Sequence, residues 1–183
     1  GVYSLVVGPD GFLYAGGEFI MAGGTAANRI ARWDGASWYS LGSGMDGSVS
    51  TLVFGPNGHL YAGGNFSNAG GVAVNHVARW DGASWHSLGS GMNGWVASMV
   101  FGPDASLYVG GSFGNAGGIA VGHVARWDGI SWHPLGAGTD GSVLALSMGQ
   151  DGLLYAGGYF TIAGGMVVNR IASWDGTSWY PLG

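Results

Sequence analysis

A period of 47 residues runs through the whole chain and restricts its possible folds more than any other feature. Two sets of aromatic residues recur at this interval, namely Tyr14, Tyr61, Tyr108 and Tyr155, and Trp33, Trp80, Trp127 and Trp174. The second and third periods are identical at 30 of 47 positions. Such agreement is typical of tandem structural repeats. We therefore divide the chain into four repeats in a single array, spanning residues 1–46, 47–93, 94–140 and 141–183.

Each repeat has the pattern of four short β-strands. In the second repeat, residues 48–55 and 59–66 are β-rich runs joined by a Gly-Pro-Asn-Gly turn. Residues 75–81 and 84–89 form a second pair of runs around a glycine-centred turn. Apolar residues at helical spacing are always interrupted by glycine, so the pattern predicts no helix.

Both faces of each predicted sheet carry large apolar side chains, so each sheet needs a neighbour on either side. Sheets stacked face to face around an axis form a β-propeller, in which the strand edges stay short and protected. The sequence therefore predicts an all-β propeller with four blades of four antiparallel strands. Eight tryptophans are expected to fill the space between blades: Trp33, Trp38, Trp80, Trp85, Trp127, Trp132, Trp174 and Trp179.

Composition excludes several classes of function. Only 8% of the 183 residues are charged, the five basic residues are all arginine, and the formal net charge is −5, which argues against nucleic-acid binding. Apolar runs are too short to insert into a bilayer. The absence of cysteine excludes a disulfide framework and cysteine-based metal sites.

The repeated motifs V-x-x-L, L-Y-x-G-G-x-F, A-R-W-D-G and S-W-x-x-L-G resemble kelch-type propeller repeats. The pattern is more similar still to fungal cortical-marker ectodomains used in bud-site selection and to long secreted bacterial propeller-repeat proteins. One departure is the spacing of Trp33 and Trp38, which is shorter than in typical kelch repeats. The resemblance implies an innermost first strand and an extracellular or cell-surface location.

Two closures of the ring are compatible with four repeats. Four blades could close a small ring, or the chain could be an arc of a larger ring completed by another copy or by further repeats. An open arc would expose two large apolar faces, which soluble proteins avoid. The long arrays of the similar proteins favour the larger assembly.

The predicted topology places the connection between strands two and three on the same face as the linker to the next blade. The first residue of that connection varies between repeats, as Glu18, Asn65, Ser112 and Tyr159. Loops on a rigid scaffold often carry binding residues. Free variation of surface loops is the alternative explanation.

Trp95 is the one tryptophan outside the repeated pair, at a position where other repeats have Ser48 and Ser142. Next to Asn93, Asn65 and Asn68, its ring could stack on a sugar while the amides bond hydroxyl groups. Asn115, the counterpart of Asn68, joins this candidate set, as do Glu18 and Tyr159. The alternative for Trp95 is packing over a neighbouring blade.

Histidine pairs in the two central repeats are replaced jointly in the outer ones. His76 with His86, and His123 with His133, correspond to Arg29 with Tyr39 and Arg170 with Tyr180. Because Arg and Tyr cannot replace a histidine pair as metal ligands, we expect a contact across the second hairpin and no metal site. The recurring arginines of the third strand are expected to be structural hydrogen-bond donors, namely Arg32, Arg79 and Arg126.

No motif of an enzyme or cofactor site is present, and most aspartates precede glycine as in tight turns. The sequence therefore predicts no catalytic residue and no cofactor. The favoured function is a non-enzymatic extracellular binding or adhesion module for a glycan or protein, where repeated sites would permit multivalent binding. A structural scaffold that associates through apolar blade faces is the first alternative, and an enzyme is the second.

Overall fold

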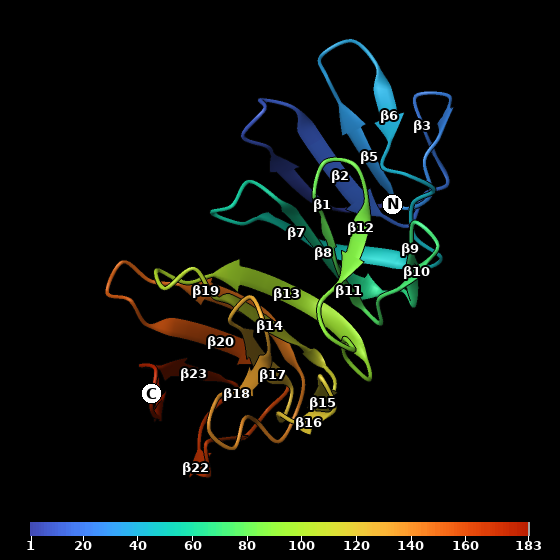
Figure 1. Cartoon of the computed structure of the whole chain (residues 1–183). Helices are drawn as coiled ribbons and strands as arrows, with labels where there is room; N and C mark the ends of the chain where they lie inside the picture. The colour runs from blue at the N-terminus through green and yellow to red at the C-terminus, as the bar shows by residue number, and fades with distance from the viewer. Residues whose placement is uncertain (183) are drawn as a thin grey trace. The chain divides into compact units, whose positions relative to one another are not determined.

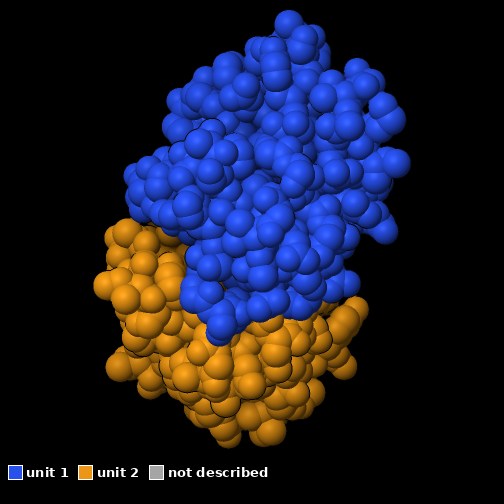
Figure 2. All heavy atoms as spheres, turned by 45° about the vertical axis from the view of Figure 1, so that its right-hand side comes forward, with its two compact units in different colours: residues 1–91 blue, residues 92–183 orange. Residues whose placement is uncertain are grey.

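The computed structural model describes residues 1–182. These residues fall into two compact units, residues 1–91 and residues 92–182 (Figure 2). Each unit contains two four-stranded antiparallel sheets, here called blades 1 to 4 in chain order (Figure 1). The described residues contain no helix, and hence none long and apolar enough to cross a membrane. Gly183, the last residue of the predicted fourth repeat, lies outside the described residues.

The first unit holds blades 1 and 2. Blade 1 consists of β1 (Val2–Val7), β2 (Leu13–Gly17), β5 (Ile30–Trp33) and β6 (Trp38–Ser40), hydrogen-bonded in that order. Blade 2 consists of β7 (Ser48–Phe54), β8 (Leu60–Asn65), β11 (Val77–Trp80) and β12 (Trp85–Ser87). A small two-stranded hairpin follows the second strand of each blade: β3 (Met21–Ala22) with β4 (Thr25–Ala26), and β9 (Asn68–Ala69) with β10 (Val72–Ala73).

The second unit repeats this order in blades 3 and 4. Blade 3 consists of β13 (Trp95–Phe101), β14 (Leu107–Ser112), β17 (Val124–Trp127) and β18 (Trp132–Pro134). Blade 4 consists of β19 (Val143–Met148), β20 (Leu154–Gly158), β23 (Ile171–Trp174) and β24 (Trp179–Pro181). The hairpins are β15 (Asn115–Ala116) with β16 (Ile119–Ala120), and β21 (Ile162–Ala163) with β22 (Met166–Val167).

The prediction of four blades with four antiparallel strands each is confirmed, but the prediction of long loops between the second and third strands is wrong. Part of each connection is the small hairpin. In blade 2, Gly70 and Gly71 form its two-residue turn with φ angles of 59° and 83°. Two consecutive positive φ angles define a type I′ turn, for which Gly-Gly is well suited. The repeated Gly-Gly is therefore a hairpin signal.

Acidic and amide side chains fix the tight turns inside each blade. Asn57 Oδ1 accepts a hydrogen bond from the backbone N–H of His59 at 3.1 Å, at the turn between β7 and β8. Asp81 Oδ1 accepts from Ala83 and Ser84 at 2.9 and 2.8 Å, at the turn between β11 and β12. Such local side-chain bonds are the reason Asx residues favour turns.

The tryptophan of the fourth strand joins consecutive blades within a unit. In blade 2, the Trp85 indole N–H donates to the Leu41 carbonyl of blade 1 at 3.0 Å. A Cβ atom placed on Gly70 would lie 2.8 Å from Trp85 Cδ1, so the ring also packs on the hairpin of its own blade. Trp179 makes the matching bond to the Leu135 carbonyl at 2.8 Å. The ring therefore fills the space between a hairpin and the preceding blade.

The tryptophans of the third and fourth strands also contact each other inside each blade. Their ring centroids are 5.1 to 5.5 Å apart with interplanar angles of 47° to 50°, in the pairs Trp33–Trp38, Trp80–Trp85, Trp127–Trp132 and Trp174–Trp179. Tilted aromatic pairs at this distance contribute about 0.5–1.5 kcal/mol beyond the area they bury.

Each unit has an apolar core between its two blades. In the first unit, Tyr14, Ile30, Leu41 and Met45 of blade 1 pack against a set from blade 2 that includes Val49 and Leu52. In the second unit, Tyr108, Val124 and Leu135 of blade 3 pack against blade 4 residues that include Val143 and Phe160. The same repeat positions therefore form the junction in both units.

A glycine on the second strand lets the blades of one unit approach closely. A Cβ atom on Gly16 would lie 2.5 Å from Val49 Cγ1, whereas on Gly157, the same position in blade 4, the nearest atom is the Arg170 carbonyl oxygen at 3.9 Å. We expect Gly16→Ala to lower the free energy of unfolding by about 1–3 kcal/mol through overpacking. Gly157→Ala should change it by less than about 0.5 kcal/mol.

Chemical denaturation of the two variants beside the wild type measures this difference. Equal effects of the two substitutions would contradict the packing of blade 2 on blade 1 described above.

Candidate functional site

The linker between two blades folds back onto the small hairpin of the second blade. In the first unit, Met45 pairs with Ala69, and the backbone N–H of Gly70 donates to the Gly44 carbonyl at 2.8 Å. In the second unit, Thr139 pairs with Ala163 in the same way. The structure therefore brings together the two connections that the topology placed on one face. This surface is called the hairpin–linker face below.

One side chain of each linker fixes the hairpin. Asp46 Oδ1 accepts from the backbone N–H groups of Ser67 and Asn68 at 2.8 and 2.9 Å, and Asp46 Oδ2 accepts from the Asn68 amide at 2.8 Å. Burial alone would raise the pKa of Asp46, but the donors of Asn68 and Ser67 outweigh it and hold the pKa below its usual value. The carboxylate is therefore charged at neutral pH.

Asn93 and Asp140 occupy the same position in the following linkers. Asn93 Oδ1 accepts from the backbone N–H groups of Gly114 and Asn115, both at 2.9 Å. Asp140 Oδ1 accepts from Thr161 and Ile162 at 2.7 and 2.8 Å. An amide and a carboxylate therefore perform the same structural task.

A polar cavity of about 350 Å³ opens on the hairpin–linker face of the first unit. Its lining comprises Asn28, Arg29, Ser43, Gly44, Met45, Asp46, Asn68 and Gly71. The Asn28 amide donates to the Ser43 carbonyl at 3.0 Å, and Arg29 Nη1 donates to the Met45 carbonyl at 3.4 Å. The cavity thus combines a guanidinium, a carboxylate and two amides in one place.

Arg29 enters this cavity from a left-handed backbone conformation. Its φ is 64°, and His76, His123 and Arg170 at the same repeat position have φ angles of 72°, 68° and 66°. Such values are uncommon for residues other than glycine. The Arg29 N–H donates to the Phe19 carbonyl at 2.7 Å, and its carbonyl accepts from Gly17 at 2.9 Å, which holds the conformation.

The cavity chemistry is specific to the first unit. In the second unit, the positions of Asn28, Arg29 and Asn68 hold Gly122, His123 and Ile162. Burial lowers the pKa of His123, while the charge of Asp140 acts against this shift. His123 is therefore neutral at pH 7, and this junction lacks the cation and both amides.

The predicted binding residues fall into both units. In the second unit, Asn93 contacts the hairpin residue Asn115, and Trp95 begins β13 opposite Ser112 with an exposed side chain. Tyr159, just after β20, is also exposed.

In the first unit, Asn68 lines the cavity, and Asn65 ends β8 opposite Ser48. Glu18 accepts from the Tyr3 hydroxyl at 2.8 Å, and this bond raises the pKa of Tyr3. The predicted grouping of Trp95 and Asn93 with Asn65 and Asn68 stays a prediction.

Sequence reasoning overlooked three residues of the cavity: Asn28, Arg29 and Asp46. The expected contact of Arg29 with Tyr39 is wrong, because Arg32 stacks on Tyr39 at 5.1 Å and on Phe12 at 4.8 Å. The replacement of Asp46 by Asn93 between repeats was the available signal.

The expected contact between the paired histidines is also wrong. His86 lies opposite Arg79 in the sheet, and its Nε2 is 2.6 Å from Asp81 Oδ2. His76 precedes β11, and its Nδ1 is 3.3 Å from the Gly64 carbonyl oxygen. The joint exchange of the two histidines therefore reflects two separate environments.

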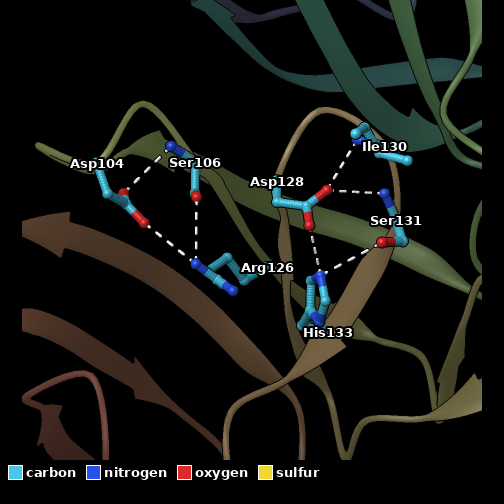
Figure 3. Close-up of polar contacts among 7 residues, drawn as sticks. All are labelled: Asp104, Ser106, Arg126, Asp128, Ile130, Ser131 and His133. Atoms are coloured by element: carbon cyan, nitrogen blue, oxygen red, sulfur yellow. Dashed lines mark hydrogen bonds and ion pairs between the residues drawn. The ribbon is translucent and has the colours of Figure 1, made fainter.

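The strand-three arginines contact side chains at the turn between the first two strands. Arg126 Nη1 donates to Asp104 Oδ2 at 3.3 Å and to Ser106 Oγ at 3.5 Å, and Arg79 Nη1 is 3.2 Å from His59 Nδ1. Figure 3 shows the Arg126 group beside a second, separate network in which His133 Nε2 is 2.7 Å from Asp128 Oδ2. Both groups hold turns of blade 3.

Within residues 1–182, every side-chain carboxylate accepts at least one hydrogen bond from the chain's own groups. The set consists of Glu18 and the nine aspartates 10, 34, 46, 81, 104, 128, 140, 151 and 175. The pKa values of eight of these aspartates are displaced, and all eight are lowered. Within residues 1–182, no cluster of three or more His, Asp or Glu side chains could hold a metal ion.

The role of Asp46 can be tested with a matched pair of variants. Asp46→Ala removes the acceptor for Ser67 and Asn68, so we expect faster hydrogen exchange at these two amides and a loss of about 1 kcal/mol in the free energy of unfolding. Asp46→Asn keeps the acceptor, as Asn93 does in the next linker, and should cost less. Exchange measured by NMR decides, and unchanged rates at both amides in Asp46→Ala would contradict the role.

Comparison with known proteins shows the fold. A family model described as a domain of unknown function (DUF5122) beta-propeller matches residues 55–80. No curated protein matches the chain. Among solved structures, a catalytically inactive virginiamycin B lyase from Staphylococcus aureus, crystallised with quinupristin, is 16% identical with a TM-score of 0.60, and the match covers 99% of this chain and 55% of the lyase.

Two further structures have similar scores. The extracellular domain of a hybrid two-component system from B. thetaiotaomicron is 14% identical with a TM-score of 0.63, over 98% of this chain and 22% of that one. A gluconolactonase from Xanthomonas campestris is 15% identical with a TM-score of 0.59, over 96% of this chain and 60% of that one. The chain thus spans at most about 60% of these proteins, and at this identity the likeness establishes a β-propeller fold alone.

Proposed function

We propose that this chain is a non-enzymatic binding module of an extracellular or cell-surface protein, which holds a neutral, hydroxyl-rich ligand such as a glycan on its hairpin–linker face. The observation that carries the proposal is the polar cavity of the first unit, where Arg29, Asp46 and Asn68 line one space. Ligand sites commonly combine a preformed cavity with a few placed polar groups.

The chemistry of the cavity suits hydroxyl groups. A hydroxyl both donates and accepts, so it can bond to a carboxylate, to an amide and to a guanidinium at once. The positive charge of Arg29 is balanced by the negative charge of Asp46, whose pKa is lowered. A strongly anionic ligand such as a phosphate would meet the carboxylate, which disfavours it.

The state of the carboxylates supports binding over catalysis. A general acid that works near neutral pH needs a raised pKa, as in a buried carboxyl group. All displaced aspartate pKa values in this chain are lowered, and each of these carboxylates already accepts hydrogen bonds from its own turn or linker. The lyase and lactonase among the similar structures are therefore matched in fold, and we transfer no catalytic residue from them.

The extracellular location is proposed from two sources. The sequence pattern resembles secreted and surface propellers, and the extracellular domain of a hybrid two-component system is among the structures of similar fold. Trp95, Asn93 and Asn115 are proposed as a second contact region, because an exposed indole beside amide groups can stack on a sugar ring.

Substitutions copied from the chain's own repeats provide the test. Arg29→His and Asn68→Ile together introduce the residues that the second unit carries as His123 and Ile162, so the backbone conformation is retained. In a glycan array followed by titration of the best glycan, we expect the double variant to bind at least tenfold more weakly, since lost hydrogen bonds to charged groups cost about 1.5–3 kcal/mol. The thermal midpoint should fall by only about 2–4 °C, because the variant loses the Asn68 amide bond to Asp46 but keeps the backbone bonds of the hairpin.

Trp95→Ala serves as the comparison variant. If Trp95→Ala loses binding while the double variant keeps it, the site lies in the second unit and the assignment to the cavity is overturned. If the wild type binds no glycan on the array, the proposed ligand class is wrong.

A further inference from the structure

Blade 1 exposes an apolar face whose counterpart in blade 2 is buried against blade 1. Leu5 of β1 is 59% exposed, while Leu52, the same repeat position in blade 2, is 7% exposed. Val2 is likewise 56% exposed, and its counterpart Val49 is fully buried against blade 1. The face of blade 1 that carries Val2 and Leu5 is called the front face below.

The front face includes an unfilled apolar cavity of about 240 Å³. Its lining comprises Gly1, Val2, Ala15, Phe19, Met21, Ala22, Gly23 and Trp38. In blade 2, the matching space between hairpin and tryptophan is filled by blade 1, whose Leu41 carbonyl accepts from Trp85 and whose Met45 pairs with Ala69. Within residues 1–182, the Trp38 indole N–H has no hydrogen-bond acceptor.

Blade 4 presents the opposite half of the same junction. Ile171 is 42% exposed, although its blade 1 counterpart Ile30 is fully buried against blade 2. Leu182 is 40% exposed, whereas its counterpart Leu41 is 3% exposed. Gly157, as noted above, has open space where Gly16 receives Val49. The face of blade 4 that carries Ile171 and Leu182 is called the back face.

We propose that the back face of one copy of this chain docks on the front face of a second copy, head to tail, in the geometry that joins blade 1 to blade 2. Leu182 of the first copy then enters the cavity beside Trp38 of the second, and its carbonyl accepts the Trp38 indole N–H. Ile171 covers Val2 and Leu5. This proposal is independent of the proposed binding function.

Three features favour a second copy as the occupant. The two faces are complementary because each junction inside the units is built from the same repeat positions. The side chains named on both faces are apolar, so no charge is buried by the contact. Large exposed apolar surface on a soluble protein marks an interaction site.

The contact lacks hydrogen bonds that the internal junctions have, because the linker bonds of Met45 and Asp46 have no counterpart after blade 4 within residues 1–182. One bond between the sheets is missing as well. Ser4 and Ser98 accept from the backbone N–H groups of Leu52 and Leu146 at 2.9 and 3.1 Å. Ala145 stands at this position in blade 4, so the N–H of Leu5 would lack that acceptor. A front-to-back contact is heterologous, so it extends until the ring closes or a chain of copies forms.

Two variants block one face each and test the proposal. Leu5→Asp alters the front face and Ile171→Asp the back face, and both side chains are exposed, so neither change opens a core cavity. By sedimentation equilibrium over a concentration series, the wild type should have a mass at least twice the 18.6 kDa of one chain. In each variant the dissociation constant for self-association should rise at least tenfold, since the contact would bury an aspartate.

An equimolar mixture of the two variants separates head-to-tail docking from every symmetric alternative. The mixture retains one intact front and one intact back face, so it should form a species of two chains that neither variant forms alone. Trp38→Phe should weaken wild-type association about fivefold through loss of one hydrogen bond. Ile130→Asp, at an exposed turn of blade 3, which carries neither face, should leave association unchanged.

The overturning results are equally definite. A wild type that sediments as a single chain at all concentrations overturns the proposal. That result would also be expected if the natural partner of these faces is a further repeat of a longer polypeptide and not a second copy. A mixture of Leu5→Asp and Ile171→Asp that stays monomeric overturns the head-to-tail arrangement.

Discussion

The hydrogen bond from a fourth-strand tryptophan to a leucine carbonyl of the preceding blade determines how the blades of one unit pack. Trp85 makes it to Leu41 and Trp179 makes it to Leu135. The bond is buried, so losing it would leave a polar N–H unsatisfied in an apolar core, at a cost of about 1–3 kcal/mol. The other side of the ring packs on a hairpin glycine, which fixes the hairpin relative to the junction.

The position of the hairpin accounts for the hairpin–linker face. Once Trp85 has placed the hairpin, the linker pairs with it through Met45 and Ala69, and Asp46 accepts from the backbone N–H groups of Ser67 and Asn68. The polar cavity is the space left beside this contact. Every linker thus needs a side-chain acceptor for the hairpin N–H groups, while the residues around this acceptor can differ. One junction therefore has Arg29 and another has His123.

The sequence was sufficient to predict the strands but only part of the site. Alternation, turn residues and the 47-residue period locate β7, β8, β11 and β12 to within a few residues. The sequence pattern predicts loops in place of the small hairpins because two residues per strand give no periodic signal. Asn68 is predicted as an amide on the same face as Trp95, but Arg29 and Asp46 are missed, since their proximity depends on the linker folding back over the hairpin, which no local pattern encodes.

Hydrogen exchange of the individual indole N–H groups, measured by NMR in dilute solution, tests the central role of the tryptophans most directly. The Trp85 and Trp179 indole protons are donated to buried carbonyls and should exchange slowly, at rates close to those of the core amides. The Trp38 proton, at the same repeat position without such an acceptor, should exchange quickly. Exchange of Trp85 and Trp179 as fast as that of Trp38 would contradict the account.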